Sequence, residues 1–249
     1  MRGYTLVHEL GIKNDELRID PSLLFCSDEN SSPLYTVSMK KITVDVVLKK
    51  LGKLYPDAKC SLDWKTPLDL LIATILSAQC TDKRVNIVTK SLFQKYKSAK
   101  DYVSVSTREL EHDIHSCGTF HMKAKAIQTS CTLILDRFSG EVPRTMHEML
   151  LLRGVGRKTA SIVLSTAYGI IEGIPVDTHC IRLSHRLGLT REKAQGKIEA
   201  DLMRKTSRKD WAMLSHLLVA HGRSVCIARS PKCFECVFRN TCPKIGVKK

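Results

Sequence analysis

The stretch LRGVGRKTA at residues 152–160 decides how the rest of the chain is interpreted. Gly154 and Gly156 bracket Val155 and lie between two segments with helical patterning. Glycine has no Cβ, so these positions can take positive φ and let another backbone approach closely. A turn that leads into a helix N-terminus also presents free N–H groups and the positive end of the helix dipole, which together favour phosphate binding. The structural alternative is a tight helix–helix turn.

The charge of the chain indicates a polyanionic partner. The sequence has 40 lysine and arginine residues against 25 aspartate and glutamate residues, which gives a net charge of +15. Residues 1–38 contain three basic and six acidic side chains, which leaves 37 basic and 19 acidic side chains in residues 39–249. Nucleic acid is the simplest explanation for such an excess, although a solubilising or ribosome-associated surface would carry the same charge.

The composition is that of a folded protein without a membrane span. Hydrophobic residues make up 43% of the chain and charged residues 26%, which is ordinary for a globular protein. The length of 249 residues suits one large domain or two modest ones. No apolar run reaches the length of a membrane span, and the N-terminus lacks a signal-peptide pattern. We therefore expect a cytosolic or nuclear compartment. Residues 1–38 differ from the rest of the chain in charge, and we interpret them either as a poorly ordered extension or as an upstream extension of the reading frame.

Helical periodicity runs through the chain from residue 42, and strand alternation is absent. The start of the second helix is the clearest, because Thr66 can cap it, Pro67 fits the first helical position and Asp69 follows three residues after the cap. The pattern predicts an all-α protein of about ten helices, near residues 42–55, 67–79, 83–96, 107–116, 122–138, 145–152, 157–168, 178–187, 191–205 and 208–221.

Lys158 is a candidate nucleophile because it follows the glycine turn directly. Ala160, Ile162 and Val163 lie along the same helix, and these apolar neighbours predict partial desolvation of the amine. Desolvation favours the neutral amine, which is the form that attacks an electrophile. Asp177, in the run VDTH, is a candidate to accept a proton or to stabilise positive charge during such an attack. The alternative role of Lys158 is a solvated charge or a plain phosphate contact.

Four of the ten cysteines are closely spaced and predict a metal site. Their pattern is C-x6-C-x2-C-x5-C, with a single C-x2-C pair, whereas zinc sites more often use two such pairs. The spacing alone leaves zinc and an iron–sulfur cluster open. The other six cysteines are scattered, and we expect them to be small buried apolar residues rather than a disulfide framework. The four candidate ligands are Cys226, Cys233, Cys236 and Cys242.

Three stretches of the chain resemble the endonuclease III family of DNA repair glycosylases. LRGVGRKTA followed by VDTH is similar to the helix-hairpin-helix and catalytic aspartate of that family. LLIATILSAQCTD at residues 70–82 and HGRSVCIARSPKC at 221–233 are similar to two further family motifs. The resemblance runs from about residue 42 to residue 242 and implies two helical domains with the DNA cleft between them. These would be a six-helix barrel at 60–170, and a cluster domain made of 39–59 and 171–249.

The resemblance also implies a reaction and a cofactor. It implies a bifunctional enzyme that removes oxidised pyrimidines from double-stranded DNA and then cuts the strand by β-elimination. Lys158 would attack the sugar C1′ and form an imine, with Asp177 as its partner. The four clustered cysteines would hold a [4Fe-4S] cluster. We expect a monomer, located in the cytoplasm with the nucleoid in a prokaryote or in the nucleus of a eukaryote.

Several further residues are candidate DNA contacts, and the chain departs from the family pattern at two places. Gln79 matches the residue that fills the gap left by an extruded base. Its structural alternative is an ordinary helix C-terminal residue. The family commonly has a bulky apolar wedge after Gly118, where this chain has Thr119 and Phe120, and it has proline where this chain has Arg153. The remaining contacts are expected at Gly154, Val155, Gly156, Arg157, Arg229 and Lys232.

Two other functions compete with the bifunctional enzyme. A monofunctional glycosylase of the adenine or mismatch type would release a base without cutting the strand, and such relatives generally lack the lysine. A non-catalytic, cluster-bearing DNA-binding module would bind DNA without releasing any base. Trapping of a covalent protein–DNA adduct distinguishes the bifunctional enzyme from these two alternatives.

Overall fold

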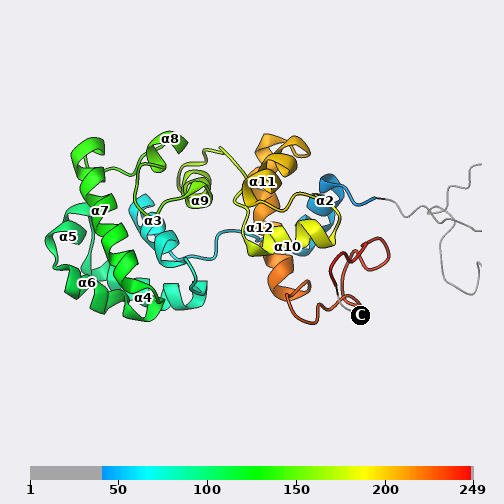
Figure 1. Ribbon diagram of the computed structural model, residues 1–249, viewed down its shortest axis with the longest axis horizontal. Coiled ribbons are helices and arrows are strands. Elements are labelled where there is room, and N and C mark those ends of the chain that lie inside the picture. Colours follow the sequence, from blue (N-terminus) through cyan, green and yellow to red (C-terminus); the bar gives the residue numbers. More distant parts are fainter. Residues whose placement is uncertain (1–40, 248–249) are drawn as a thin grey trace, which may run out of the picture. The chain divides into compact units, whose positions relative to one another are not determined.

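The structure, a computed structural model, describes residues 41–247, and the regular elements in this range are all helical (Figure 1). The expectation of an all-α protein is confirmed for this part of the chain. The extension expected at residues 1–38 lies outside the described residues. No helix in the described range is long and apolar enough to cross a membrane. The α-helices are α2 (Val44–Leu54), α3 (Pro67–Leu76), α4 (Asp82–Lys95), α5 (Ala99–Ser104), α6 (Thr107–Ile114), α7 (Phe120–Phe138), α8 (Met146–Met149), α9 (Arg157–Tyr168), α10 (Thr178–Arg186), α11 (Gln195–Arg204) and α12 (Trp211–Ser224), with 3-10 helices η3 (His115–Cys117) and η4 (Arg208–Asp210).

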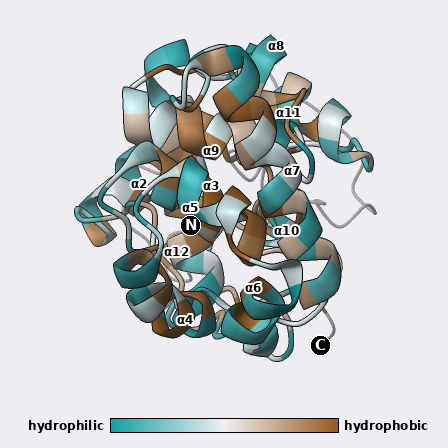
Figure 2. Cartoon of the chain, turned by 90° about the vertical axis from the view of Figure 1, so that its left-hand side faces the viewer, coloured by the Kyte–Doolittle hydropathy of each residue, from teal (hydrophilic) through white to brown (hydrophobic). Residues whose placement is uncertain are grey.

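One hydrophobic core surrounds α3. Residues 68–76 of this helix are all buried, because the helix is apolar on every side and has to be covered on every side. The helices α4, α7 and α9 pack against it. The core draws its buried side chains from Leu62 to Leu164. Hydrophobic residues gather between the helices and hydrophilic residues lie on the outward faces (Figure 2).

A second core joins the two ends of the described chain. Val47 and Leu51 of α2 are fully buried in it, together with Phe238 from the C-terminal loop. The helix α12 packs against both α2 and α10. Residues 42–51 and 174–238 supply the buried side chains of this core, so the N-terminal helix packs with the C-terminal part of the chain. The domain boundaries placed at residues 59 and 170 stay predictions.

Local sequence signals determine several helix ends. Thr66 Oγ1 accepts from the Asp69 N–H at 3.1 Å, and Asp69 Oδ2 accepts from the Thr66 N–H at 2.9 Å, which is the reciprocal pair of a capping box. Pro67 occupies the first turn, as predicted. Gly169 ends α9 with φ of 68°, a conformation in which the missing Cβ removes the steric cost.

Two short helices differ from the sequence-based expectation. The six-residue α5 was not predicted, although Ser98 and Asp101 form a capping box at its start. The α8 helix ends at Met149 rather than near residue 152. Thr145 and Glu148 have the spacing of a capping box, but the box is incomplete, because the Thr145 hydroxyl donates to Glu148 Oε2 at 2.7 Å and that carboxylate does not reach back to the backbone. Both helices are too short for a periodic pattern to be read with certainty.

Candidate active site and nucleic-acid interface

The glycine turn between α8 and α9 has two glycines with different roles. Gly154 has φ of +78°, and a Cβ built on it would lie 3.0 Å from the Cβ of Ala126. Gly156 has φ of −94° and ψ of 175°, so the expectation that both glycines could use positive φ holds only for Gly154. The extended geometry at Gly156 follows from its place as the N-cap of α9.

The surroundings of Gly156 leave room for another backbone. A Cβ at this position would meet no atom within 4 Å. No side chain caps the start of α9, so the first N–H groups of the helix have no side-chain partner there. Val155 between the glycines is buried at 7% exposure and fixes the turn to the core. The packing of the protein therefore requires glycine at position 154 but not at position 156.

Lys158 is exposed at the second position of α9. Ala160 and Val163 are fully buried and Ile162 is half-buried, so these apolar side chains cover the core and do not enclose the lysine. The expectation of a desolvated amine is therefore wrong for the protein alone, because the apolar neighbours lie on the other face of the helix. Burial raises the pKa of the Cys60 thiol, and the positive charge of Lys158 is close enough to oppose that rise.

Asp177 is fixed by a helix cap. It is the N-cap residue of α10, and its Oδ1 accepts from the Cys180 N–H at 2.8 Å. Within the described part of the chain, Asp177 and Lys158 do not form an ion pair at 4.0 Å or less. One carboxylate oxygen is thus held by the backbone of α10, while Lys158 is carried by the separate helix α9.

Arg157 is occupied by a carboxylate. Its Nε donates to both oxygens of Glu199 on α11, at 2.9 and 3.1 Å, and its Nη2 donates to the Glu172 carbonyl at 3.3 Å. The Glu199 side chain is 9% exposed and that of Arg157 is 48% exposed. A Cβ on Gly173 would overlap Glu199 Oε1, so a larger residue at this position would displace the Glu199 carboxylate from its place beside Arg157. The expected contact of Arg157 with DNA stays a prediction, and its guanidinium already has an internal partner.

The two loops that were expected to enter the DNA are both built around positive φ. Gln79 follows the end of α3, is exposed and has φ of 54°. Thr119 is exposed with φ of 43° and follows Gly118, whose φ is 65°. Residues with a side chain rarely adopt this region, so tertiary contacts have to hold both loops. Neither residue is simply the last residue of a regular helix.

Phe120 at the start of α7 is held by two histidine rings. Its ring centroid lies 4.7 Å from that of His115 and 4.0 Å from that of His121. His121 Nδ1 is 2.8 Å from the Glu111 carboxylate, which anchors the stack to α6. Phe120 is half-buried and Thr119 is exposed, so Thr119 rather than Phe120 projects from this loop.

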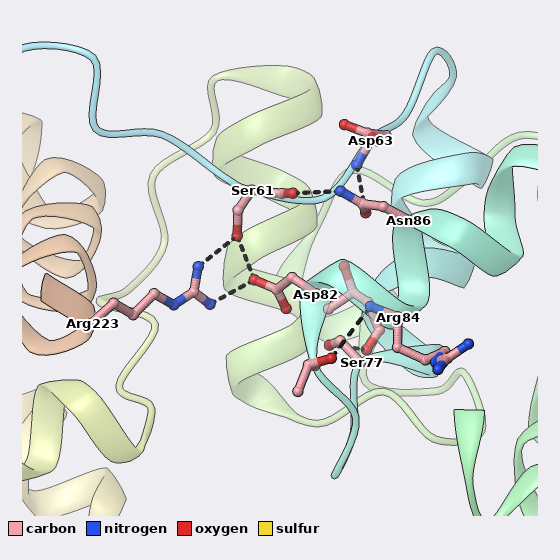
Figure 3. A network of polar contacts seen from close by, with 9 residues as sticks. Ser61, Asp63, Ser77, Asp82, Arg84, Asn86 and Arg223 are labelled. Carbon is pink, nitrogen blue, oxygen red and sulfur yellow. Dashed lines mark hydrogen bonds and ion pairs between the residues drawn. The ribbon is translucent and has the colours of Figure 1, made fainter. Parts of the chain in front are cut away.

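A polar cluster that the sequence did not predict joins α12 to the start of α4 (Figure 3). Arg223 Nη2 lies 2.6 Å from Asp82 Oδ2, and Arg223 Nη1 donates to the Ser61 hydroxyl at 2.9 Å. The Ser61 hydroxyl donates to the same Asp82 oxygen. Burial alone would raise the pKa of Asp82, but the hydrogen bond from Ser61 and the guanidinium of Arg223 hold that pKa below its usual range.

The four clustered cysteines line one pocket after the end of α12. Three of their sulfurs lie within reach of nitrogen atoms. Across the described residues, no three or more histidine, cysteine or acidic side chains converge as tightly as a bare metal ion requires. The sulfur–nitrogen distances are 3.5 Å from Cys226 to Arg186 Nη1, 3.3 Å from Cys236 to His221 Nε2, and 3.4 Å from Cys242 to the Lys244 N–H.

Two buried or half-buried arginines hold the loop that carries these cysteines. Arg186 is 7% exposed and donates to the Ile227 carbonyl at 2.7 Å and to the Ala228 carbonyl at 2.9 Å. Arg182 Nε donates to the Cys226 carbonyl at 3.1 Å. The two basic residues expected to contact DNA from this loop, Arg229 and Lys232, are exposed.

The chain is similar in sequence and in structure to known DNA repair proteins. Residues 72–208 match the family described as HhH-GPD superfamily base excision DNA repair protein. Endonuclease III from Synechocystis sp. is 51% identical over 213 residues, which are 86% of this chain and 97% of that protein. Endonuclease III from Bacillus subtilis is 46% identical over 200 residues, which are 80% of this chain and 91% of that protein.

A solved structure of a trapped endonuclease III–DNA covalent intermediate has the same fold. It matches with a TM-score of 0.78 and 43% identity, over 81% of this chain and 94% of that chain. The helix-hairpin-helix motif and the all-helical fold place the chain among base excision repair proteins. It belongs to the endonuclease III family of the HhH-GPD superfamily.

Proposed function

We propose that the protein is a base excision repair enzyme that removes oxidised pyrimidines from double-stranded DNA and then cuts the strand as an AP lyase. The observation that carries this proposal is the position of Lys158. It is an exposed amine at the open start of α9, immediately after a glycine turn that leaves room for a phosphate backbone. Similarity to endonuclease III over 86% of the chain supports the same reaction.

The glycine turn binds the strand that is to be cut. The free N–H groups at the start of α9 and the positive end of its dipole attract a phosphate. The open space at Gly156 lets that phosphate approach the backbone. The bound phosphate places the sugar of the damaged nucleotide next to Lys158, only two residues further along. Val155, buried between the glycines, keeps the turn rigid while the strand is bound.

Lys158 carries out the covalent steps. Its neutral amine attacks the sugar C1′, the glycosidic bond breaks, and the base leaves with the bonding electrons. Loss of the amine proton and opening of the sugar ring give an imine between Nζ and C1′. Removal of a proton from C2′ then expels the 3′ phosphate. The lysine is exposed in the protein alone, so we assign the desolvation that favours its neutral form to the bound DNA.

Asp177 acts through its charge. Its carboxylate is oriented by the N–H of Cys180 and does not neutralise the ammonium of Lys158 by direct pairing. It is therefore available to stabilise positive charge that develops on the sugar as the base departs, or to take the proton that the amine loses. Its own position depends on α10 and not on the substrate, which preorganises the site.

Extrusion of the base requires residues to replace it in the stack. Gln79 is exposed on a loop whose backbone is held in a rare conformation, so we assign it the role of filling the gap. Thr119 projects from the second loop, so we assign contact with the opposite strand to Thr119, with Phe120 as its support. A threonine is a smaller wedge than the bulky residue common in the family, which predicts weaker discrimination of the opposite base.

The cysteine loop fits an iron–sulfur cluster. Cys226, Cys233, Cys236 and Cys242 would hold a [4Fe-4S] cluster, and the nitrogens beside three of the sulfurs suit charged thiolates. A bound cluster supplies a rigid crosslink between the two ends of this loop. The loop in turn presents the exposed Arg229 and Lys232 to a phosphate backbone. Metal analysis of anaerobically purified protein tests the assignment, because iron with sulfide supports it and zinc contradicts it.

We propose double-stranded DNA with damaged bases or abasic sites as the partner, and a monomer as the active form. The location would be the cytoplasm with the nucleoid in a prokaryotic source, or the nucleus in a eukaryotic one. The relatives named above are bacterial proteins, which favours the first.

Borohydride trapping tests the proposed reaction. Wild-type protein and the Lys158→Gln variant are incubated with a duplex that contains an oxidised pyrimidine, and the imine is reduced to a stable adduct. We expect an adduct for wild type only. Lys125→Gln is a matched control, because Lys125 is an exposed lysine of α7 that no step of the reaction uses. Base release without an adduct would instead indicate a monofunctional glycosylase, and binding without base release a non-catalytic module.

A further inference from the structure

Lys123 is a buried lysine whose partners are backbone carbonyls. It lies in the first turn of α7 and is 4% exposed. Its Nζ donates to the Leu76 carbonyl at 2.8 Å and to the Cys117 carbonyl at 2.7 Å. Leu76 is the last residue of α3 and Cys117 is the last residue of η3. The amine thus joins the C-terminal ends of two helices, where exposed carbonyl oxygens favour a cation.

Each of these helix ends leads into one of the two loops assigned to base extrusion. Gln79 comes three residues after Leu76, and Thr119 comes two residues after Cys117. Both loop residues have positive φ, so neither conformation is stable without tertiary support. Lys123 fixes the point from which each loop leaves its helix, and it does so for both loops with one side chain.

The same face of α7 also supports the glycine turn. Ala126 lies against Gly154, and the Ser130 hydroxyl donates to the Arg153 carbonyl at 2.9 Å. Positions 123, 126 and 130 follow each other at helical spacing, so they share one face. This helix therefore supports three of the segments that are expected to contact DNA, the Gln79 loop, the Thr119 loop and the glycine turn, and Lys123 is the residue that holds the two extrusion loops.

Lys123 is an expensive way to fill space in the core. Burial of its ammonium group costs folding free energy, and an apolar side chain of similar length would fill the same space without that cost. Burial accordingly lowers the pKa of Lys123. A buried cation is advantageous here because three hydrogen-bond donors on one atom can hold two separate carbonyls.

We propose that Lys123 is a positioning residue that sets the distance between the Gln79 loop and the Thr119 loop, and that it thereby controls base extrusion without taking part in bond cleavage. This inference rests on the proposed function. It predicts that the loss of Lys123 separates two activities, because a damaged base in a duplex has to be extruded, whereas an abasic site in single-stranded DNA has not.

The test compares these two substrates for the Lys123→Met variant of the full chain. We expect the rate at which an oxidised pyrimidine is excised from a duplex to fall by at least about tenfold, because two charge-assisted hydrogen bonds are lost. Borohydride trapping on a single-stranded abasic site is expected to stay within about twofold of wild type, a change too small to reflect the loss of such a bond. An equal fall on both substrates, or no fall on the duplex, would overturn the inference.

Gln128→Met is the matched control. Gln128 lies on the same helix, and its Nε2 also donates to two backbone carbonyls, those of Tyr102 at 3.2 Å and Val105 at 2.9 Å, but neither leads into an extrusion loop. Gln128→Met should lower the melting temperature and affect excision from the duplex and trapping on the single-stranded abasic site to the same extent. A fall in duplex excision alone in this variant would contradict the inference. If Lys123→Met does not fold, Lys123→Gln, which removes the charge but keeps an amide NH₂ group, is measured in the same way. Absence of both activities in wild type would refute the proposed function instead.

Discussion

Alanine at the two glycines of the turn should give opposite results. In Gly154→Ala the backbone has to keep φ at +78°, which costs a residue with a Cβ about 1–2 kcal/mol. The new methyl group would also lie 3.0 Å from the Cβ of Ala126, so either the turn or α7 has to shift. We expect a loss of about 2 kcal/mol of folding free energy, which lowers the melting temperature by about 4–8 °C in a chain of this size.

Gly156→Ala should leave the fold intact and weaken the binding of DNA. The φ of −94° is accessible to alanine, and the added Cβ meets no atom within 4 Å. The lower entropy of the unfolded chain stabilises the variant by about 0.4–1 kcal/mol, while the poorer N-cap offsets a similar amount. The methyl group instead occupies the space through which a phosphate approaches. Loss of about 1.4 kcal/mol from one phosphate contact weakens binding about tenfold.

Thermal unfolding and fluorescence anisotropy with a duplex that contains an abasic-site analogue measure both effects. The anisotropy is recorded at one fixed salt concentration, because phosphate contacts depend strongly on salt. Binding of the duplex by Gly156→Ala as tightly as by wild type would contradict a phosphate site at Gly156. Unfolding of Gly154→Ala at the wild-type temperature would show that the positive φ carries no cost.

Three further predictions concern charged residues. Asp177→Asn keeps a good N-cap and should lose activity at wild-type stability, whereas Asp177→Ala should also lose about 1 kcal/mol of folding free energy, as measured by urea unfolding. Arg157→Ala leaves the buried Glu199 carboxylate without its partner and should destabilise the fold by about 1–3 kcal/mol. The double variant Arg157→Ala with Glu199→Gln should recover most of this loss, as measured by denaturant unfolding. The pKa of Asp82 is lower in the folded protein than in the unfolded chain. The difference in unfolding free energy between wild type and Asp82→Asn should therefore be constant above about pH 4 and should shrink as the pH falls further. A difference that grows in acid would contradict the ion pair with Arg223.

The sequence predicts well those features that depend on neighbouring residues. Thr66, Pro67 and Asp69 determine the start of α3 within one turn of chain, and Gly169 ends α9 where the pattern predicts. The glycine turn was recognised for the same reason, since all its parts lie within a few residues. The similarity to endonuclease III confirms the family that these motifs indicated.

Features that depend on distant residues could not be predicted in the same way. The partner of Arg157 is Glu199, which lies 42 residues further along the chain, so the ion pair is invisible in the local pattern. Lys158 was expected to be desolvated because apolar residues follow it, but helical geometry turns these residues towards the core. The burial of Lys123 is not predictable from the sequence, because a lysine in the first turn of an amphipathic helix is normally solvated.

The position of the reduced adduct on the protein identifies the nucleophile. Wild-type protein is trapped with borohydride on a duplex that contains an oxidised pyrimidine, digested, and mapped by mass spectrometry. We predict that the sugar remnant is attached to Lys158, the second residue of α9. An adduct on any other residue, such as Lys123 or the N-terminal amine, would contradict it.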